Sequence, residues 1–269
     1  MGEARVSEAQ THRADLESLV QEAIPELSGA GPEQVLAWAL GTFPRDRMAL
    51  CTSLQDEGMA ILDMAWRIDP KVRVFTIDTG RLPAATLDLM EEVRGHYGIP
   101  LEVLFPDADE VSSMVTEHGI NLFYGSPELR LSCCGVRKAH PLNRRLAALD
   151  AWITGLRRDQ APARDSARVV EWDQEHGGIA KVNPLVDWTR DQVLGYVREH
   201  DVPRNALYAH GYTSIGCDPC TRAIEPGEDL RAGRWWWETG DKECGIHYEM
   251  KVNERGETVA VSMRGKADG

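Results

Sequence analysis

The sequence predicts an α/β protein built on a doubly wound parallel sheet, followed by a C-terminal tail. Short apolar stretches alternate with helical stretches of about 10–15 residues between residues 47 and 154. This alternation is typical of βαβ units, in which helices cover both faces of a parallel sheet. The helical stretch at 57–68 is apolar nearly all round, as expected for a buried helix. From Thr221 onward the chain is rich in Gly, Pro and charged residues, which predicts a tail laid over the core.

Two helices are expected before the sheet, over residues 8–23 and 32–41. Ser7 and Gln10 have the spacing of a capping box, in which two side chains bond the free N–H groups of a helix start. Pro32 lies in the first turn of the second helix, where its missing N–H removes no helical hydrogen bond.

The alternating part of the chain predicts four strands and the helices between them. The expected strands are residues 47–52, 72–77, 101–105 and 151–154. The expected helices are residues 57–68, 83–97 and 108–118 and, after a loop around 124–132, a helix from near Cys134 to Leu149. The chain is thereby predicted to divide into N-terminal helices at 1–45, an α/β domain at 46–220 and a C-terminal tail at 221–269.

A hairpin and one more helix are expected after the fourth strand. Residues 169–172 and 179–182 flank a turn that contains two glycines, which favours a hairpin. A helix over residues 189–200 is expected because Thr189 and Gln192 have the spacing of a second capping box.

The composition favours a cytoplasmic enzyme. No apolar run approaches 18 residues, and the polar N-terminus lacks the apolar core of a secretory signal, so no membrane association is expected. The formal net charge of −13 argues against a nucleic-acid-binding protein, which is usually basic. Arginines and lysines nevertheless gather around residues 130–145, 157–158 and 222–234. Such groups suit a small anionic substrate in a cleft, and ion pairs on a solvated surface are the alternative.

Polar and basic residues follow three of the predicted strands. Ligands of doubly wound sheets bind beyond the carboxyl ends of the strands. Each residue alone is a weak signal, because every strand end needs a turn, but together they favour a nucleotide with an anionic tail bound by residues 46–220. The candidate substrate contacts are Ser53 and Gln55 after the first strand, Asp78, Thr79 and Arg81 after the second, and Arg157 and Arg158 after the fourth.

Four of the six cysteines form two tight pairs, Cys133-Cys134 and Cys217-x-x-Cys220. In a cytosolic chain, paired cysteines indicate metal binding or redox chemistry rather than structural disulfides. Four thiolates can hold a zinc ion or an iron–sulfur cluster. Adjacent cysteines diverge and suit a single zinc ion poorly, whereas each can reach a different iron of a cubane. The spacing therefore favours a [4Fe–4S] cluster, with zinc and unligated thiols as the alternatives.

The other two cysteines differ in their surroundings. Cys244 stands in a polar, Gly-containing segment with Lys242 before it and His247 after it. Nearby cations lower the pKa of a thiol, so Cys244 is a candidate nucleophile and His247 a candidate catalytic partner. The alternative is an inert buried cysteine. Cys51 lies within a predicted apolar strand, where core packing is the better interpretation.

Four motifs in order closely resemble those of the assimilatory adenylyl-sulfate (APS) reductases, members of the PAPS/APS reductase family. The likeness runs from about Arg47 to His247. The motifs are Cys133-Cys134-Gly135-Val136-Arg137-Lys138, Cys217-x-x-Cys220-Thr221-Arg222, Arg231-x-x-Arg234-Trp235-Trp236-Trp237 and Glu243-Cys244-Gly245-Ile246-His247.

The resemblance implies a fold, a cofactor and a reaction. The fold would be the adenine nucleotide α-hydrolase-like variant of the doubly wound sheet, and the cluster would not carry electrons in turnover. Cys244 would attack the sulfate sulfur of APS, expel AMP and leave an enzyme thiosulfonate, from which reduced thioredoxin would release sulfite in sulfate assimilation. The cluster ligands would be Cys133, Cys134, Cys217 and Cys220, and the groups holding the phosphosulfate would be Lys138, Arg157 or Arg158, Arg231 and Arg234.

The chain departs from the family pattern in two places. The usual glycine of the phosphate-binding turn is missing from residues 53–58. Residues 248–269 extend past the expected end, and 252–262 are predicted to form a small hairpin or to be disordered. Trp235 and its two neighbours are expected to anchor the tail by packing.

Three alternative functions are weighed against APS reduction. The same chemistry on 3′-phosphoadenosine 5′-phosphosulfate (PAPS) is the nearest, although relatives that use PAPS usually lack the cluster cysteines. An ATP pyrophosphatase would need a Ser-Gly-Gly-x-Asp-Ser loop, which residues 53–58 do not supply. In a non-catalytic iron–sulfur sensor, Cys244 would have no role. A homo-oligomer is compatible with the sequence, which does not decide the oligomeric state.

Overall fold

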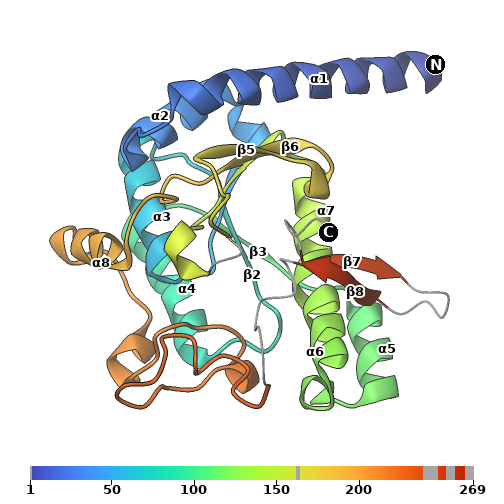
Figure 1. The fold of residues 1–269 in the computed structure, drawn as a ribbon, viewed down its shortest axis with the longest axis vertical. Helices are drawn as coiled ribbons and strands as arrows, with labels where there is room; N and C mark the ends of the chain where they lie inside the picture. The colour runs from blue at the N-terminus through green and yellow to red at the C-terminus, as the bar shows by residue number, and fades with distance from the viewer. Residues whose placement is uncertain (1, 162–163, 239–247, 253–257, 264–269) are drawn as a thin grey trace. The chain divides into compact units, whose positions relative to one another are not determined.

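The computed structural model describes residues 2–161, 164–238, 248–252 and 258–263, with side chains from residue 10 to residue 238 (Figure 1). The chain divides into two compact units. The first contains residues 1–75, 92–102 and 145–203, and the second contains residues 76–91, 103–144 and 204–269. The predicted domain boundaries at residues 45 and 220 stay predictions.

One mostly parallel sheet of six strands forms the centre of the fold, in the order β3-β2-β1-β4-β6-β5. β1 pairs in parallel with β2 and β4, β4 pairs in parallel with β6, and only the edge strand β5 runs antiparallel to β6. The predicted doubly wound sheet is therefore confirmed, including the hairpin at its edge. The strands are β1 (Met48–Cys51), β2 (Val74–Ile77), β3 (Leu101–Leu104), β4 (Ala151–Ile153), β5 (Val170–Asp173) and β6 (Ile179–Val182).

The helices largely follow the sequence prediction. The first helix is longer than predicted: it begins at Gly2, so Ser7 lies within it rather than at its start. Thr189 does cap its helix, since its Oγ1 accepts from Gln192 N–H at 3.3 Å. Within the described part of the chain, no helix is both long and apolar enough to cross a membrane. The helices are α1 (Gly2–Glu26), α2 (Pro32–Thr42), α3 (Asp56–Ile68), α4 (Ala84–Tyr97), α5 (Ala108–His118), α6 (Pro127–Cys134), α7 (His140–Leu146) and α8 (Arg190–Glu199).

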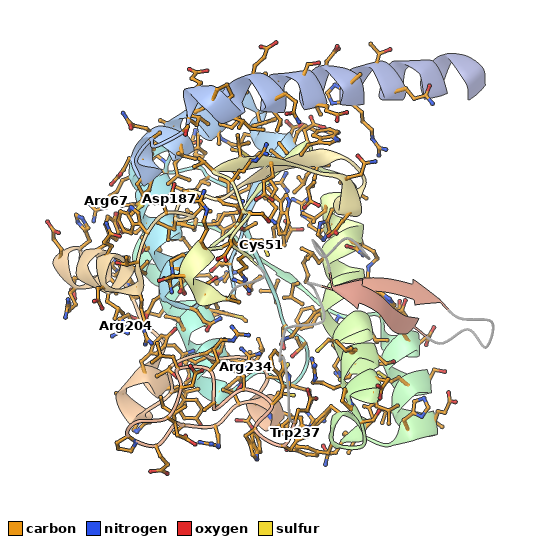
Figure 2. All side chains as sticks on the ribbon, in the orientation of Figure 1. Cys51, Arg67, Asp187, Arg204, Arg234 and Trp237 are labelled. Atoms are coloured by element: carbon orange, nitrogen blue, oxygen red, sulfur yellow. The ribbon has the colours of Figure 1, made fainter. Side chains whose placement is uncertain are left out.

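A buried carboxylate ties three helices of the first unit together. Asp63 on α3 is 2% exposed and accepts from the hydroxyls of Tyr196 at 2.7 Å and Tyr97 at 3.3 Å. Arg67, one turn along α3 and labelled in Figure 2, donates to the same carboxylate at 2.6 Å. Burial, followed by the bonds to Asp63, raises the pKa of both tyrosines. Both tyrosine hydroxyls therefore stay neutral and donate hydrogen bonds. α3, α4 and α8 are thus joined through the hydrogen bonds of one buried carboxylate.

The largest difference from the prediction lies before the first cysteine pair. Residues 124–132 were expected to form a loop, but α6 begins at Pro127. Ser126 Oγ accepts from Leu129 N–H at 3.2 Å, and Pro127 occupies the first turn, as at many helix starts. The cysteines consequently end a helix instead of beginning one. A π-helix over Gly135–Ala139 connects α6 to α7, which ends at Leu146 rather than at Leu149.

The predicted hairpin near the C-terminus is present as two strands. β7 (Tyr248–Val252) pairs antiparallel with β8 (Thr258–Met263). The residues between the two strands lie outside the described part of the chain.

An ion-pair network at the start of β4 predicts how stability depends on pH. Asp150 accepts from Arg47 Nη2 at 2.6 Å and lies 3.0 Å from His12 Nε2. Burial alone would raise the pKa of Asp150, but the bonds from Arg47 and His12 hold it below its ordinary value. A carboxylate with a lowered folded pKa stabilises the fold above its unfolded pKa, and that stability is lost as pH falls through the folded pKa.

We therefore expect Asp150→Asn to lower the free energy of unfolding at pH 7 and to have a smaller effect below about pH 4. Urea denaturation at several pH values measures both. Asp88→Asn, at an exposed position of α4, is the matched control. An equal loss for Asp150→Asn at pH 7 and pH 3 would contradict the role given to the ion pairs.

Candidate active site

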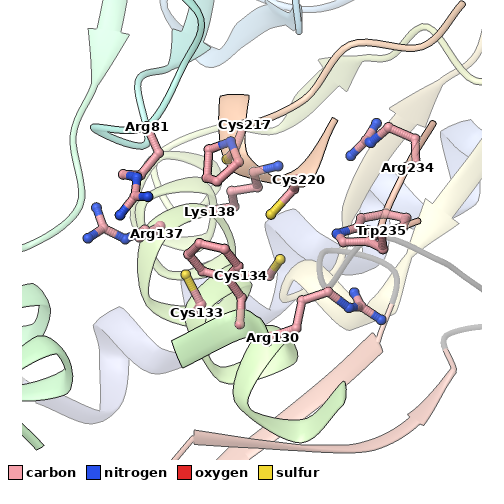
Figure 3. A pocket seen from close by; sticks show the side chains of 12 residues that line it. Arg81, Arg130, Cys133, Cys134, Arg137, Lys138, Cys217, Cys220, Arg234 and Trp235 are labelled. Atoms are coloured by element: carbon pink, nitrogen blue, oxygen red, sulfur yellow. The ribbon is translucent and has the colours of Figure 1, made fainter. Parts of the chain in front are cut away.

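The two cysteine pairs meet in one pocket of the second unit (Figure 3). All four cysteines are buried. They share the pocket wall with cationic and aromatic side chains, and no carboxylate lines it among the described residues. Besides the cysteines, the lining residues are Arg81, Phe123, Arg130, Arg137, Lys138, Pro219, Arg234 and Trp235.

The first pair is placed by the junction of α6 with the π-helix. Cys133 and Cys134 are the last two residues of α6, and the π-helix begins at the next residue. A π-turn is wider than an α-turn and changes which residues share a helix face, and such turns are frequent at functional sites. Arg137 and Lys138, within the π-helix, line the same pocket as the two cysteines (Figure 3).

The second pair is placed by a tight turn. Cys220 N–H donates to the Cys217 carbonyl at 2.9 Å, with Pro219 inside the single turn that results. Thr221 Oγ1 donates to the same carbonyl at 3.0 Å and accepts from Gly216 N–H at 3.1 Å. Backbone and hydroxyl bonds thus hold both thiols on one short loop.

Thr79, which follows β2, lies against the second pair. Its side chain is fully buried, and its Oγ1 is 3.2 Å from Cys217 Sγ. Arg137 Nη1 donates to the Thr79 carbonyl at 2.7 Å, and Asp218 N–H donates to the Arg81 carbonyl at 2.8 Å. The segment predicted to contact substrate is therefore also part of the wall around the cysteines.

Buried thiols without a ligand are expected to be protonated. Burial raises the pKa of Cys133, and it raises the pKa of Cys220 to about 12, helped by the neighbouring Cys217. Arg137 and Lys138 act against burial at Cys133. Metal binding requires thiolates and releases their protons. The cations of the pocket wall would offset the negative charge of four thiolates that hold a cluster. Among the described residues, no three His, Cys, Asp or Glu side chains converge on a single ion position.

The pocket has the donor chemistry of an iron–sulfur site with four cysteine ligands. Its described wall offers four soft thiols and several fixed positive charges, and that part of the wall has no carboxylate to compete for the metal. Thiolates are the usual ligands of such clusters. The residues present therefore fit a [4Fe–4S] cluster.

Arg234 and Trp235 close the pocket from the tail. The sequence places Arg234 in a polar tail segment, and in the structure it is only 6% exposed, because its guanidinium lies against Gly216 and over the Trp235 ring at 4.5 Å. A Cβ at Gly216 would come within 2.5 Å of Arg234 Nη2, so a larger residue there would displace the guanidinium. Arg234 Nη1 donates to Ser214 at 3.2 Å, while its buried Nε has no partner among the described residues. Arg231, by contrast, is only half-buried.

Trp235 and Trp237 anchor the tail by packing, as predicted, whereas Trp236 is exposed. Trp235 is 1% exposed and belongs to the apolar cluster around the cysteines, and Trp237 packs against that cluster. Trp237 also lies edge-on to Tyr124, at 4.5 Å between ring centres. Trp235 has a left-handed backbone with φ of +44°. That conformation costs a bulky residue about 1–3 kcal/mol, so the surrounding contacts must hold it in place.

In the first unit, the loop from β1 to α3 supplies two predicted contacts. Ser53 is exposed, and its Oγ accepts from Gln55 at 3.1 Å. The buried Leu54 between them adopts a left-handed backbone with φ of +56°. Leucine thus takes the conformation that glycine would adopt more easily in this turn. Gly58 is needed within α3, because a Cβ there would come within 2.4 Å of Thr52 Oγ1.

The two arginines after β4 have different partners. Arg157 is 5% exposed and pairs with Glu57, at the start of α3, at 3.0 Å. It also pairs with Asp159. Arg158 pairs with Asp187 and donates to the Ala167 carbonyl at 2.8 Å. Only Arg157 therefore lies beside the β1–α3 loop, and an anion bound there would compete with Glu57.

Two predicted catalytic residues, Cys244 and His247, lie outside the described residues. Cys51 lies at the end of β1, where the residue keeps some exposed surface but its thiol is buried. Burial raises the pKa of its thiol to about 12, so it is a poor nucleophile at neutral pH.

Two arginines of the pocket were not among the predicted site residues. Arg130 and Arg137 are 2% and 7% exposed and line the pocket beside the cysteines. Arg137 belongs to the first cysteine motif, so its spacing from the cysteines could have predicted that it lies at the site. Arg130 lies about one helical turn before Cys133, which becomes informative only once α6 is known to begin before it.

Comparisons first define the class of fold. FMN adenylyltransferase of Candida glabrata superimposes with a TM-score of 0.51 at 14% identity, covering 92% of this chain and 78% of that one. At this identity only the fold is shared. The shared fold confirms the predicted doubly wound sheet of the adenine nucleotide α-hydrolase-like type.

Closer relatives then define the family. The profile of the phosphoadenosine phosphosulfate reductase domain matches residues 47–223. A phosphoadenylyl-sulfate (PAPS) reductase of Candida auris, solved as a phosphate complex, has a TM-score of 0.63 and 31% identity, over 74% of this chain and 96% of that one. The adenosine 5′-phosphosulfate reductase of Burkholderia cepacia is 50% identical over 203 residues, 75% of this chain and 81% of the relative. The chain belongs to the phosphoadenosine phosphosulfate reductase domain family.

Proposed function

We propose that this protein reduces adenosine 5′-phosphosulfate to sulfite and AMP in sulfate assimilation, through a thiosulfonate on Cys244 and with thioredoxin as the electron donor. The observation that carries the proposal is the pocket in which four buried cysteines from two distant pairs are surrounded by cations. The relative from Burkholderia cepacia, named for reduction of the same substrate, supports the choice of substrate.

Cys133, Cys134, Cys217 and Cys220 would hold a [4Fe–4S] cluster. When bound, the cluster would supply local order and an electrostatic field rather than electrons for turnover. Lys138 lines the pocket within four residues of Cys134, and this proximity favours a contact with both cluster and substrate.

The anionic end of the substrate needs positive groups. As charge develops on the leaving phosphate, a planar guanidinium can bond two of its oxygens at once. Lys138, Arg231 and Arg234 are assigned to the phosphosulfate, together with Arg157, whose place beside the start of α3 favours it over Arg158. The other assigned contacts are Ser53, Gln55, Asp78, Thr79 and Arg81.

The chemistry divides into two substitutions at sulfur. The Cys244 thiolate, stabilised by His247, attacks the sulfate sulfur, so that a sulfur–sulfur bond forms and the bond from sulfur to the phosphate oxygen breaks. The electron pair leaves with AMP. A thioredoxin thiolate then attacks Cys244 Sγ and releases sulfite, and its second thiol resolves the mixed disulfide. The sulfate sulfur gains two electrons, and thioredoxin's dithiol becomes a disulfide.

PAPS is the second candidate substrate, because the Candida auris relative is named for it. The experiment is sulfite release from APS and from PAPS, each with reduced thioredoxin and, separately, with glutaredoxin. We expect sulfite from APS with thioredoxin and far less from PAPS. Faster release from PAPS would reverse the substrate assignment, and no sulfite from either compound would refute the proposed reaction.

The two tail arginines are expected to affect turnover alike but stability differently. Arg231→Ala and Arg234→Ala should each slow turnover by about 10²-fold, as expected for loss of an anion-stabilising donor. Only Arg234 is deeply buried against Trp235. Arg234→Ala should therefore also lower the free energy of unfolding by about 2 kcal/mol, and Arg231→Ala by no more than about 0.5 kcal/mol.

Steady-state kinetics and urea denaturation measure these two effects. Either variant that keeps full turnover would remove that arginine from the substrate site. An unchanged stability of Arg234→Ala would show that its contact with Trp235 contributes nothing to the fold.

A further inference from the structure

The chain between the second cysteine pair and the tryptophans forms one closed loop, residues 222–234. Arg222 N–H donates to the Gly233 carbonyl at 3.0 Å, and Thr221 forms an isolated antiparallel bridge with Arg234. A Cβ at Gly233 would collide with the Arg222 carbonyl oxygen, so the two ends of the loop meet through their main chains. We call residues 222–234 the arginine loop, because it contains two of the arginines assigned to the phosphosulfate.

An ion pair inside the arginine loop joins its start to its middle. Arg222 donates to both carboxylate oxygens of Glu228, from Nη1 to Oε2 and from Nη2 to Oε1, each at 2.8 Å. Both side chains are partly exposed, and exposed ion pairs add little to stability. A bidentate arginine–carboxylate pair does specify geometry, because two parallel hydrogen bonds allow one relative orientation. The pair is therefore suited to fixing the shape of the loop.

The sequence between the two partners brings them together. Residues 225–228 form a turn in which Glu228 N–H donates to the Glu225 carbonyl at 3.1 Å. Pro226 and Gly227, whose φ is +91°, are the residues that a type II turn prefers at its two central positions. Glu228 Oε2 also accepts from Glu225 N–H at 2.8 Å. The turn thus reverses the chain and returns Glu228 to Arg222.

Arg231 follows this ion pair closely along the loop. Asp229, the residue after Glu228, accepts from Arg231 N–H at its Oδ1, at 2.8 Å. The Asp229 carbonyl accepts from Ala232 N–H at 2.9 Å. The main chain of Arg231 is therefore held by a turn that begins directly after the ion pair.

Arg234, at the end of the loop, is held in a different way. Its guanidinium is buried against Gly216 and over the Trp235 ring, and both of these residues lie outside the arginine loop. Arg231 is only half-buried. Loss of the ion pair should therefore displace Arg231 more than Arg234.

We propose that Arg222 and Glu228 position Arg231 for its contact with the phosphosulfate, an inference that rests on the proposed function. Neither Arg222 nor Glu228 needs to touch the substrate, so both are positioning residues. A small misplacement of a group that stabilises the transition state is costly in rate, because its hydrogen bonds depend on distance and angle.

The sign of the effect separates positioning from electrostatics. Removal of the Glu228 charge makes the loop more positive, which by itself favours an anionic substrate. Loss of positioning acts in the opposite direction. Glu228→Gln should therefore slow turnover if the ion pair positions Arg231, and a purely electrostatic role would leave turnover unchanged or raise it.

The test is sulfite release from APS with reduced thioredoxin by variants of the iron-loaded protein. Glu228→Gln should slow turnover about 10-fold, because glutamine has one acceptor oxygen and cannot form the bidentate pair. Arg222→Lys keeps the positive charge but loses the planar fork, so it should also be slower than the unaltered protein. Glu225→Gln is the matched control: it removes the same charge from an exposed side chain of the same loop and should leave turnover unchanged.

Double variants show whether the effect passes through Arg231. In the Arg231→Ala background, Glu228→Gln should have no further effect, because the arginine that the ion pair positions is gone. In the Arg234→Ala background, Glu228→Gln should still slow turnover about 10-fold. The iron content of Glu228→Gln should match that of the unaltered protein, since neither Arg222 nor Glu228 is among the residues that line the cysteine pocket.

Full turnover by Glu228→Gln would overturn the inference. An undiminished effect of Glu228→Gln in the Arg231→Ala background would overturn it too, as would a loss of iron in parallel with the rate. In each of these cases the unaltered protein still releases sulfite, so the proposed function stands and the inference alone fails. If the unaltered protein releases no sulfite from APS, the proposed function itself is refuted, and the inference fails with it.

Discussion

Radiolabelled APS mixed with the protein in the absence of thioredoxin should leave labelled sulfur on the unaltered chain and none on Cys244→Ser. In the proposed mechanism only the first substitution needs substrate, so the thiosulfonate accumulates when no reductant is present. The adduct should contain sulfur but no adenine, because AMP leaves during the attack. Addition of a reduced thiol should discharge the label as sulfite.

Two controls make this experiment specific. Cys244→Ser should keep the absorbance of an iron–sulfur cluster, because Cys244 is not an assigned ligand. Cys51→Ser should be labelled normally, since burial raises the pKa of the Cys51 thiol to about 12 and leaves little thiolate at neutral pH. Label on Cys244→Ser would show that the nucleophile lies elsewhere, even if APS is the substrate.

His247 gives the same experiment a pH dependence. If the imidazole helps to hold the Cys244 thiolate, His247→Ala should slow labelling and move its pH dependence upward. A lost stabilising partner raises the pKa of a thiol, so a higher pH is needed for the same thiolate fraction. An unchanged pH profile would remove His247 from the catalytic group.

The unaltered protein should be brown and contain about four irons and labile sulfide per chain, and Cys133→Ser or Cys220→Ser should lose them. The two residues belong to different pairs that line one pocket, so either loss removes a ligand from the same site. Cluster binding and folding are coupled, because the ligands must be deprotonated and brought together. The variants should therefore unfold at lower urea concentrations than the iron-loaded protein.

Removal of the iron from the unaltered protein should reproduce the loss of stability. Iron removal leaves four buried thiols among several fixed cations. The positive charge of the pocket is then no longer offset by thiolates. Iron and sulfide analysis, visible absorbance and urea denaturation measure these effects, with Cys51→Ser as the matched cysteine control. Stoichiometric zinc without labile sulfide would contradict the cluster assignment.

Much of the fold could be predicted because its signals are local. The alternation of apolar and helical stretches places β1 to β4 and α3 to α5 within a few residues of their positions in the structure. Thr189 and Gln192 mark a helix start by their spacing alone. The start of α6 was predicted wrongly, although Ser126 and Pro127 are ordinary signals of a helix N-terminus. The predicted helix was instead begun at the adjacent cysteines.

The candidate site was predictable where chemistry follows from residue type. Two cysteine pairs predict a metal or cluster site, since four closely paired thiols are the usual ligands of zinc and of iron–sulfur clusters. Arginines near them indicate an anion. These inferences depend on composition and spacing, which the sequence contains in full.

What only the tertiary structure decided is which polar groups are buried and which partners they have. Arg234 is buried because Gly216 and Trp235, which are distant from each other in sequence, leave room for its guanidinium. Arg157 is held by Glu57 and Arg158 by Asp187, although the two arginines are adjacent. The Arg130–Glu238 pair joins residues more than 100 positions apart. The charge of a side chain follows from its residue type. Its ion-pair partners and its burial depend on which distant parts of the chain the fold brings into contact.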